Sequence, residues 1–114
     1  MSEQAKLSAK KCVPCEGGVL VLPEDKARKL LEQVPDWKLF GNKSISRGFE
    51  FGSYRKAQAW LNRVADLAEE EGHHPDVTWN YRKVLIELST HAIGGLSEND
   101  FILAAKIDKL STID

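Results

Sequence analysis

The stretch from Glu69 to Asp100, EEEGHHPDVTWNYRKVLIELSTHAIGGLSEND, carries the patterns that decide the fold. A run of acids precedes Gly72, a typical helix stop, and two short apolar segments and a glycine pair follow it. This order predicts a helix end, two strands and a helix start. The stretch also contains all three histidines of the chain: His73, His74 and His91. Because imidazole ordinarily titrates near pH 6.5, this clustering indicates proton chemistry.

The two strands are expected around Asp76–Tyr81 and Lys83–His91, with Pro75 favouring an extended backbone at His74. Alternate residues of a strand point to opposite faces of the sheet. In the second strand, one face carries Val84, Ile86, Leu88 and Thr90, and the other carries Leu85, Glu87, Ser89 and His91. The strand therefore predicts His91 on the half-polar face of the sheet, away from the core.

Three helices are expected. The strongest apolar periodicity runs from Ser53, a plausible cap, to Glu71. An earlier helix is predicted from about Pro23 to Pro35, with acids in its first turn. The last should open at Ser97–Asp100, which matches a capping box and explains the preceding Gly94–Gly95 as a turn rather than a nucleotide loop.

Between the first two helices, residues 36–52 alternate with period two around a Gly41–Asn42 pair, which predicts a β-hairpin. Arg47 falls on its apolar side and must reach an edge or a partner. The element order α-β-β-α-β-β-α predicts an α+β domain: a four-stranded antiparallel sheet with helices packed on one face. The open face, which bears Leu85, favours self-association.

The acids that end the central helix have the wrong sign for a helix C-terminus. For Glu70 and Glu71 a solvated face is a sufficient explanation. Glu69 lies one helical turn before His73, so we expect it to hydrogen-bond this imidazole and favour its charged form. Asp100 is expected to act first as a cap residue.

Length and composition set limits on function. The chain has 114 residues, enough for one core, with 42% hydrophobic and 29% charged residues. Its net charge of −1 provides no overall attraction to nucleic acid or to an anionic membrane. No secretory signal or membrane span is apparent, so we expect a cytoplasmic protein.

The chain divides into residues 1–21, a mobile or loosely docked arm, and residues 22–114, the domain. Both cysteines lie in the arm, in the C-x-x-C of Cys12 and Cys15. This motif could be half of a zinc site, completed by His73 and His74, a redox pair, or a minor terminal feature. The histidines could likewise be zinc ligands or plain surface residues.

Four motifs together resemble the pterin-4a-carbinolamine dehydratases. They are Glu69-x-x-x-His73-His74-Pro75, Tyr81-x-Lys83-Val84, Leu88-Ser89-Thr90-His91 and Gly95-Leu96-Ser97-x-x-Asp100. The resemblance covers about residues 22–110, and the arm is similar to that of some bacterial members. Many animal members have an aromatic residue at the position of Val77, whereas this chain has Trp79 and Tyr81 nearby.

The resemblance implies a hydro-lyase, without metal or cofactor, that dehydrates 4a-hydroxytetrahydropterin to quinonoid dihydropterin. It implies His73, His74 and His91 as catalytic residues, and a homodimer or homotetramer that could serve an aromatic amino acid hydroxylase in tetrahydrobiopterin recycling. Animal members also act as dimerisation cofactors of a homeodomain transcription factor, so a non-catalytic dimerisation or assembly module is the alternative. The substrate-binding residues are expected to be Glu69, Pro75, Trp79, Ser89, Thr90 and Asp100.

Overall fold

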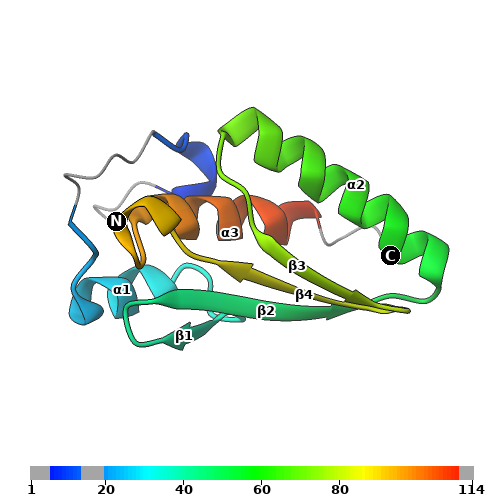
Figure 1. Cartoon of the computed structure of the whole chain (residues 1–114), viewed down its shortest axis with the longest axis horizontal. Coiled ribbons are helices and arrows are strands. Elements are labelled where there is room, and N and C mark those ends of the chain that lie inside the picture. Colours follow the sequence, from blue (N-terminus) through cyan, green and yellow to red (C-terminus); the bar gives the residue numbers. More distant parts are fainter. Residues whose placement is uncertain (1–5, 14–19, 111–114) are drawn as a thin grey trace.

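The computed structural model describes residues 6–13 and 20–110 of the chain (Figure 1). The elements follow the predicted order, with two additional short 3-10 turns, η1 and η2. They are η1 (Leu7–Ala9), α1 (Glu24–Leu31), β1 (Lys38–Phe40), β2 (Ser44–Glu50), α2 (Tyr54–Glu71), β3 (Asp76–Asn80), β4 (Lys83–Leu88), η2 (His91–Ile93) and α3 (Glu98–Leu110).

The four strands form one antiparallel sheet in the order β1-β2-β4-β3. Helices α2 and α3 lie across the same face of this sheet (Figure 1). The predicted α+β class and its element order are therefore confirmed. The central pair, β2 and β4, joins strands that are separated in sequence by α2 and β3, whereas β3 is an edge strand.

The covered face of the sheet and the apolar sides of the helices form the core. Trp60 of α2 packs on Phe49 and Phe51 of the β2 region, with ring centroids 4.4 and 5.1 Å apart. The predicted ends of α2 are confirmed. The Ser53 hydroxyl accepts a hydrogen bond from the Lys56 amide at 3.1 Å, and Gly72 ends the helix in the left-handed conformation (φ +67°).

Arg47 finds the partner that its position on the apolar side of β2 requires. Its guanidinium lies 2.7 Å from an Asp108 carboxylate oxygen in α3 and 4.5 Å from the centre of the Phe49 ring. The indole N–H of Trp37 donates to the same Asp108 oxygen at 2.9 Å. A charged group is thereby accommodated beside the core without being left unpaired.

The second strand of the 76–91 region is shorter than expected, because β4 ends at Leu88 and His91 begins the η2 turn. Thr90 still points inward and is 4% exposed. The chain leaves the sheet because the Thr90 amide donates to the carbonyl of Gly95 at 2.8 Å, which closes a tight loop. A Cβ at Gly95 would lie 2.7 Å from Val21 Cγ1 and 2.8 Å from the Asn42 carbonyl oxygen, so the loop packs closely only with glycine there.

Residues 6–13 of the expected arm are docked on the domain. Leu7 is 1% exposed, and η1 packs on α3. The Leu7 amide donates to the Gln33 side chain at 3.1 Å. Cys15 and the neighbouring residues 14–19 lie outside the described part of the chain, so the alternatives left open for the C-x-x-C motif cannot be compared with the structure there. Over the described ranges, no helix has the length and apolar character needed to cross a membrane.

Candidate active site

The histidines gather at one end of the sheet, around a pocket of about 260 Å³. The pocket lies where the C-terminal end of α2, the η2 turn, the start of α3 and the docked N-terminal segment meet. Its lining is mainly polar and consists of Val13, Gly72, His73, His74, Ser89, Thr90, His91, Ala92 and Asn99. The structure thus brings together the three histidines, Ser89 and Thr90, as predicted from the sequence.

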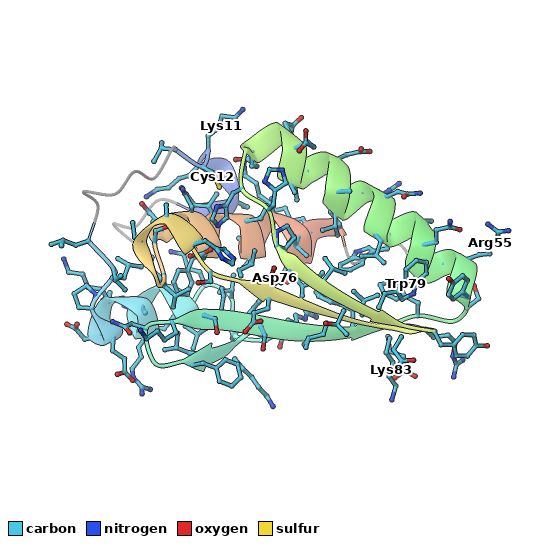
Figure 2. The ribbon with its side chains drawn as sticks, in the orientation of Figure 1. Lys11, Cys12, Arg55, Asp76, Trp79 and Lys83 are labelled. Carbon is cyan, nitrogen blue, oxygen red and sulfur yellow. The ribbon has the colours of Figure 1, made fainter. Side chains whose placement is uncertain are left out.

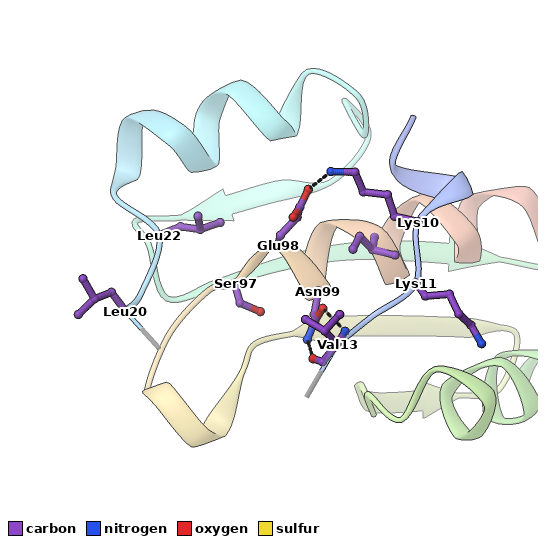
Figure 3. A pocket seen from close by; sticks show the side chains of 9 residues that line it. Lys10, Lys11, Val13, Leu20, Leu22, Ser97, Glu98 and Asn99 are labelled. Carbon is purple, nitrogen blue, oxygen red and sulfur yellow. Dashed lines mark hydrogen bonds and ion pairs between the residues drawn. The ribbon is translucent and has the colours of Figure 1, made fainter. Parts of the chain in front are cut away.

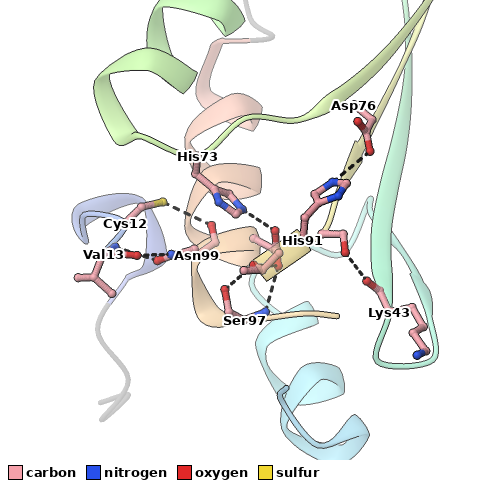
Figure 4. A network of polar contacts seen from close by, with 11 residues as sticks. Cys12, Val13, Lys43, His73, Asp76, His91, Ser97 and Asn99 are labelled. Atoms are coloured by element: carbon pink, nitrogen blue, oxygen red, sulfur yellow. Dashed lines mark hydrogen bonds and ion pairs between the residues drawn. The ribbon is translucent and has the colours of Figure 1, made fainter. Parts of the chain in front are cut away.

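His73 is held by a buried carboxylate (Figure 4). Its Nε2 lies 2.6 Å from Oδ1 of Asp100, a residue that is 0% exposed. The other carboxylate oxygen of Asp100 accepts the Thr90 hydroxyl at 2.8 Å and the Ser97 amide at 3.0 Å. Because the His73 ring, the Thr90 hydroxyl and the Ser97 amide all bind this carboxylate, it is fixed in place and holds the imidazole ring in one orientation.

The hydroxyl groups beside Asp100 have a defined direction of donation. Thr90 has one hydroxyl proton, which it gives to Asp100, so the 2.7 Å contact between Thr90 Oγ1 and Ser97 Oγ must be donated by Ser97. The expected capping box is confirmed in part, because Asp100 accepts the Ser97 amide. The expected substrate contact of Asp100 is not supported, since this carboxylate is fully buried and is connected to the pocket through the His73 and Thr90 side chains that it binds.

The hydrogen bond expected from Glu69 to His73 is wrong. Glu69 Oε2 lies 2.6 Å from Nε2 of His74, and both side chains are exposed. The error arises at Gly72, whose left-handed conformation breaks the helical i, i+4 relation on which the expectation depended. The His73 side chain points inward to Asp100 of α3, and the His74 side chain hydrogen-bonds Glu69.

His91 is held more loosely than His73. Its Nε2 is 3.7 Å from Oδ2 of Asp76, and their side chains are 75% and 63% exposed. The pair links the η2 turn to the start of β3 (Figure 4). Ser89, beside this turn, donates its hydroxyl to the Lys43 carbonyl at 2.9 Å.

Four of the six expected substrate-binding residues do not line the pocket: Glu69, Pro75, Trp79 and Asp100. Pro75 is half-buried on the connection to β3. Trp79 lies near the other end of β3 from Asp76 and stacks on Tyr54 with ring centroids 4.6 Å apart (Figure 2). The register places Trp79 opposite Val84, whereas Asp76 lies opposite Glu87, so the strand carries the indole away from the histidines.

Val13 and Asn99 line the pocket but were missed from the sequence. The amide of Val13 donates to the Asn99 side-chain oxygen at 3.0 Å, and the Asn99 side-chain nitrogen donates to the Val13 carbonyl at 2.5 Å. These residues are far apart in the sequence, and no periodicity connects them. Asn99 could have been noticed only as a polar neighbour of the predicted cap residue Asp100.

A larger hollow of about 540 Å³ lies beside the N-terminal segment (Figure 3). Its lining includes Leu20, Leu22 and Ile102, together with Lys10, which pairs with Glu98 at 2.6 Å. None of its lining residues is a histidine. The smaller histidine pocket is therefore the better candidate for catalysis.

Cys12 lies beside the pocket, with its Sγ 3.6 Å from the Asn99 carbonyl. Burial raises the pKa of the Cys12 thiol to about 12, and the neighbouring Glu71 carboxylate adds to the shift. A thiol in this state is a poor nucleophile and a poor metal ligand at neutral pH. Within residues 6–13 and 20–110, no group of three or more His, Cys, Asp or Glu side chains could hold a metal ion.

Each histidine turns its Nε2 toward a carboxylate: His73 to Asp100, His74 to Glu69 and His91 to Asp76. At His73 and His74, where the contact is 2.6 Å, an ionised carboxylate can only accept, so the Nε2–H donates and Nδ1 is left to exchange a proton with a substrate. The 3.7 Å separation at His91 is too long for a hydrogen bond and assigns neither ring nitrogen. The site therefore offers several positioned imidazoles, which suits a reaction that needs a proton donor and a proton acceptor.

Comparisons with known proteins agree with this geometry. Residues 21–110 match the family model described as pterin 4 alpha carbinolamine dehydratase. A relative from Nitrosomonas europaea, named provisionally as a pterin-4-alpha-carbinolamine dehydratase, is 49% identical over 111 residues, which cover 96% of this chain and 97% of the relative.

Two solved structures have the same fold. A transcriptional coactivator/pterin dehydratase from Brucella melitensis matches with a TM-score of 0.74 and 28% identity, over 79% of this chain and 97% of that one. A pterin dehydratase-like protein, identified as a RuBisCO assembly factor in the alpha-carboxysome, matches with a TM-score of 0.59 and 30% identity, over 69% and 93% of the two chains. The matched family region contains the whole described site except Val13, and this chain belongs to the pterin 4 alpha carbinolamine dehydratase family.

Proposed function

We propose that this protein dehydrates 4a-hydroxytetrahydropterin to quinonoid dihydropterin by histidine general acid-base catalysis. The observation that carries the proposal is the pocket with three imidazoles, each with a carboxylate at Nε2. Family membership supplies the substrate class.

In this reaction the C4a–O bond of the carbinolamine breaks and N5 loses its proton, so a C4a=N5 double bond forms and water leaves. One imidazolium donates a proton to the departing hydroxyl group, and one neutral imidazole accepts the N5 proton. We assign these transfers to His73 and His91, and His74 binds substrate or shares a proton role. Assistance of this kind is typically worth about 10²- to 10⁴-fold in rate.

The division of labour follows from how the rings are held. His73 is fixed by the buried Asp100, so it is suited to a transfer that needs a constant direction. His91 is exposed and only loosely paired with Asp76, so its ring can adjust as the product forms. Thr90 positions Asp100, and Ser89 lines the pocket wall.

The wider role we propose is recycling of a tetrahydrobiopterin-type cofactor in the cytoplasm, in support of an aromatic amino acid hydroxylase. We also propose a homodimer or homotetramer that covers the open face of the sheet. Phe40 and Leu85 support this assembly, because they are 51% and 44% exposed on that face. Light scattering at micromolar concentration tests it, and the mass of a single chain would refute it.

The decisive experiment measures dehydration of a 4a-hydroxytetrahydropterin by the purified protein, with and without a chelator. We expect acceleration above the spontaneous rate, unchanged by chelation. Activity that disappears with the chelator and returns with zinc would refute the metal-free mechanism.

A non-catalytic assembly role is the second candidate, favoured by the similarity to the RuBisCO assembly factor. The two functions require different parts of the molecule. An assembly module needs its exposed surfaces, whereas an enzyme needs the imidazoles. Replacement of His73 and His91 together should abolish dehydration and leave a binding function intact.

A further inference from the structure

We propose that the docked N-terminal segment, residues 6–13, is part of the histidine site. Its hydrogen bonds connect the end of α2 to the start of α3 and so position His73 and Asp100. The proposal rests on the proposed dehydratase function for its kinetic test, but its structural content stands on the contacts described below.

The segment grips the end of α2 through Glu71. The Cys12 amide donates to Oε1 of Glu71 at 2.9 Å, and the Lys106 ammonium of α3 lies 2.6 Å from Oε2. The Glu71 side chain is 2% exposed, so this is a buried ion pair that also holds a backbone amide. Glu71 is the last residue of α2 and lies two positions before His73.

The next residue of the segment grips the start of α3. The amide and the carbonyl of Val13 form two hydrogen bonds with the side chain of Asn99, which is 4% exposed (Figure 3). Asn99 immediately precedes Asp100, the acceptor that orients His73. Two consecutive residues of the segment, Cys12 and Val13, thus bind Glu71, two positions before His73, and Asn99, the chain neighbour of Asp100.

The hydrogen bonds that the segment makes with Glu71 and Asn99 would not be needed if it were only a surface arm. An undocked arm would leave the Glu71–Lys106 pair and the Asn99 side chain without the backbone partners that they now have. Buried polar groups are costly when they lose their partners, so the segment is bound in a single register. Val13 and Asn99 also form part of the pocket wall. A small displacement of a catalytic group can lower the reaction rate by a large factor. Contacts that fix the position of His73 should therefore affect kcat.

Leu7 is the best position for a test, because it anchors the segment but does not line the pocket. In Leu7→Ala, loosening of the segment should lower kcat about tenfold, through displacement of His73 rather than loss of a substrate contact. Leu7→Met, whose side chain fills most of the space that Leu7 occupies, should restore kcat. Val84→Ala, which truncates a buried aliphatic residue at the far end of β4, is the control and should leave kcat unchanged.

A second readout is independent of activity. The imidazole NMR signals of His73 should shift in Leu7→Ala and in Asn99→Asp, which puts an acceptor against the Val13 carbonyl, but not in Val84→Ala. Shifted signals in a protein whose wild type does not dehydrate the pterin would uphold the positioning role and reject the proposed function. Unchanged His73 signals in both segment variants, or a rate loss in Leu7→Ala no larger than in Val84→Ala, would overturn the positioning role.

Discussion

The two sides of the histidine pocket are built in opposite ways. On the side formed by α2 and α3, His73 contacts a fully buried carboxylate that two further donors hold in place. On the side formed by β3 and η2, His91 lies 3.7 Å from an exposed Asp76. Surface ion pairs contribute little, whereas a buried hydrogen-bonded network fixes its members. The difference shows that the site combines one preorganised imidazole with one that remains adjustable.

The largest expected effect comes from removing the Asp100 carboxylate, which binds His73 on the side of the pocket formed by α2 and α3. Asp100→Ala leaves His73, Thr90 and the Ser97 amide without their acceptor, and it removes a helix cap. We expect a loss of about 3 kcal/mol in the free energy of unfolding and about 10²- to 10³-fold in kcat. Urea denaturation and steady-state rates measure both.

The matched change on the loose side is Asp76→Ala. It should cost less than about 1 kcal/mol of stability and less than about tenfold in kcat, because the lost pair is exposed. Equal losses in the two variants would remove the distinction between the two sides.

Replacing the histidines themselves sharpens the comparison. His73→Ala and His91→Ala should each reduce kcat by about 10- to 10³-fold, and the double variant should lose more. Only His73→Ala should also lower the free energy of unfolding, by about 1–2 kcal/mol, since its ring is packed against Asp100. If both single variants retain the wild-type rate, the histidines are not catalytic.

Acid should weaken the rigid side first, through Glu71. Burial alone would raise the pKa of this carboxyl, but the Cys12 amide and the Lys106 ammonium outweigh it and lower the pKa below its ordinary value. A carboxyl with a lowered pKa contributes stability that is fully present above its unfolded pKa and is lost as the pH falls through the folded pKa.

Wild type should therefore lose this stability only as the pH falls below about 4.5, the ordinary pKa of a glutamate carboxyl, because the pKa of Glu71 in the folded protein is lower still. Glu71→Gln should lack this part of the acid dependence while it still accepts the Cys12 amide. Denaturation curves from pH 7 to pH 3 measure the difference, and parallel profiles for the two proteins would contradict it.

The smallest effect is expected at Glu69. Glu69→Gln should change stability by less than about 0.5 kcal/mol, because its pair with His74 is exposed. Side-chain NMR should show altered His74 signals and unaltered His73 signals. A His73 response would restore the helical pairing that the structure excludes.

Local patterns in the sequence predicted most of the fold. The Ser53 cap, the Gly72 stop and the inward row of β4 depend on neighbouring residues, and all three are found. The patterns failed where contacts join distant parts of the chain. The His73–Asp100 hydrogen bond spans 27 positions, and the Asn99 grip on Val13 spans 86, so neither leaves a periodic signal.

The Glu69 error has a different cause. Helical spacing was extended one residue past the glycine that ends the helix, where the chain changes direction. The element order could be predicted, and so could the histidine cluster, but the partner of each histidine required the fold.

The order of strands in the sheet also has a consequence for how the protein folds. The central pair β2–β4 cannot form until the chain has passed through α2 and β3, and closing such a long loop costs entropy before any contact repays it. His91 follows β4, and Asp100 lies in the helix after it. The His73–Asp100 contact spans 27 positions, across β3 and β4. We therefore expect it to form after this non-local pairing, so that partly folded chains have no assembled site.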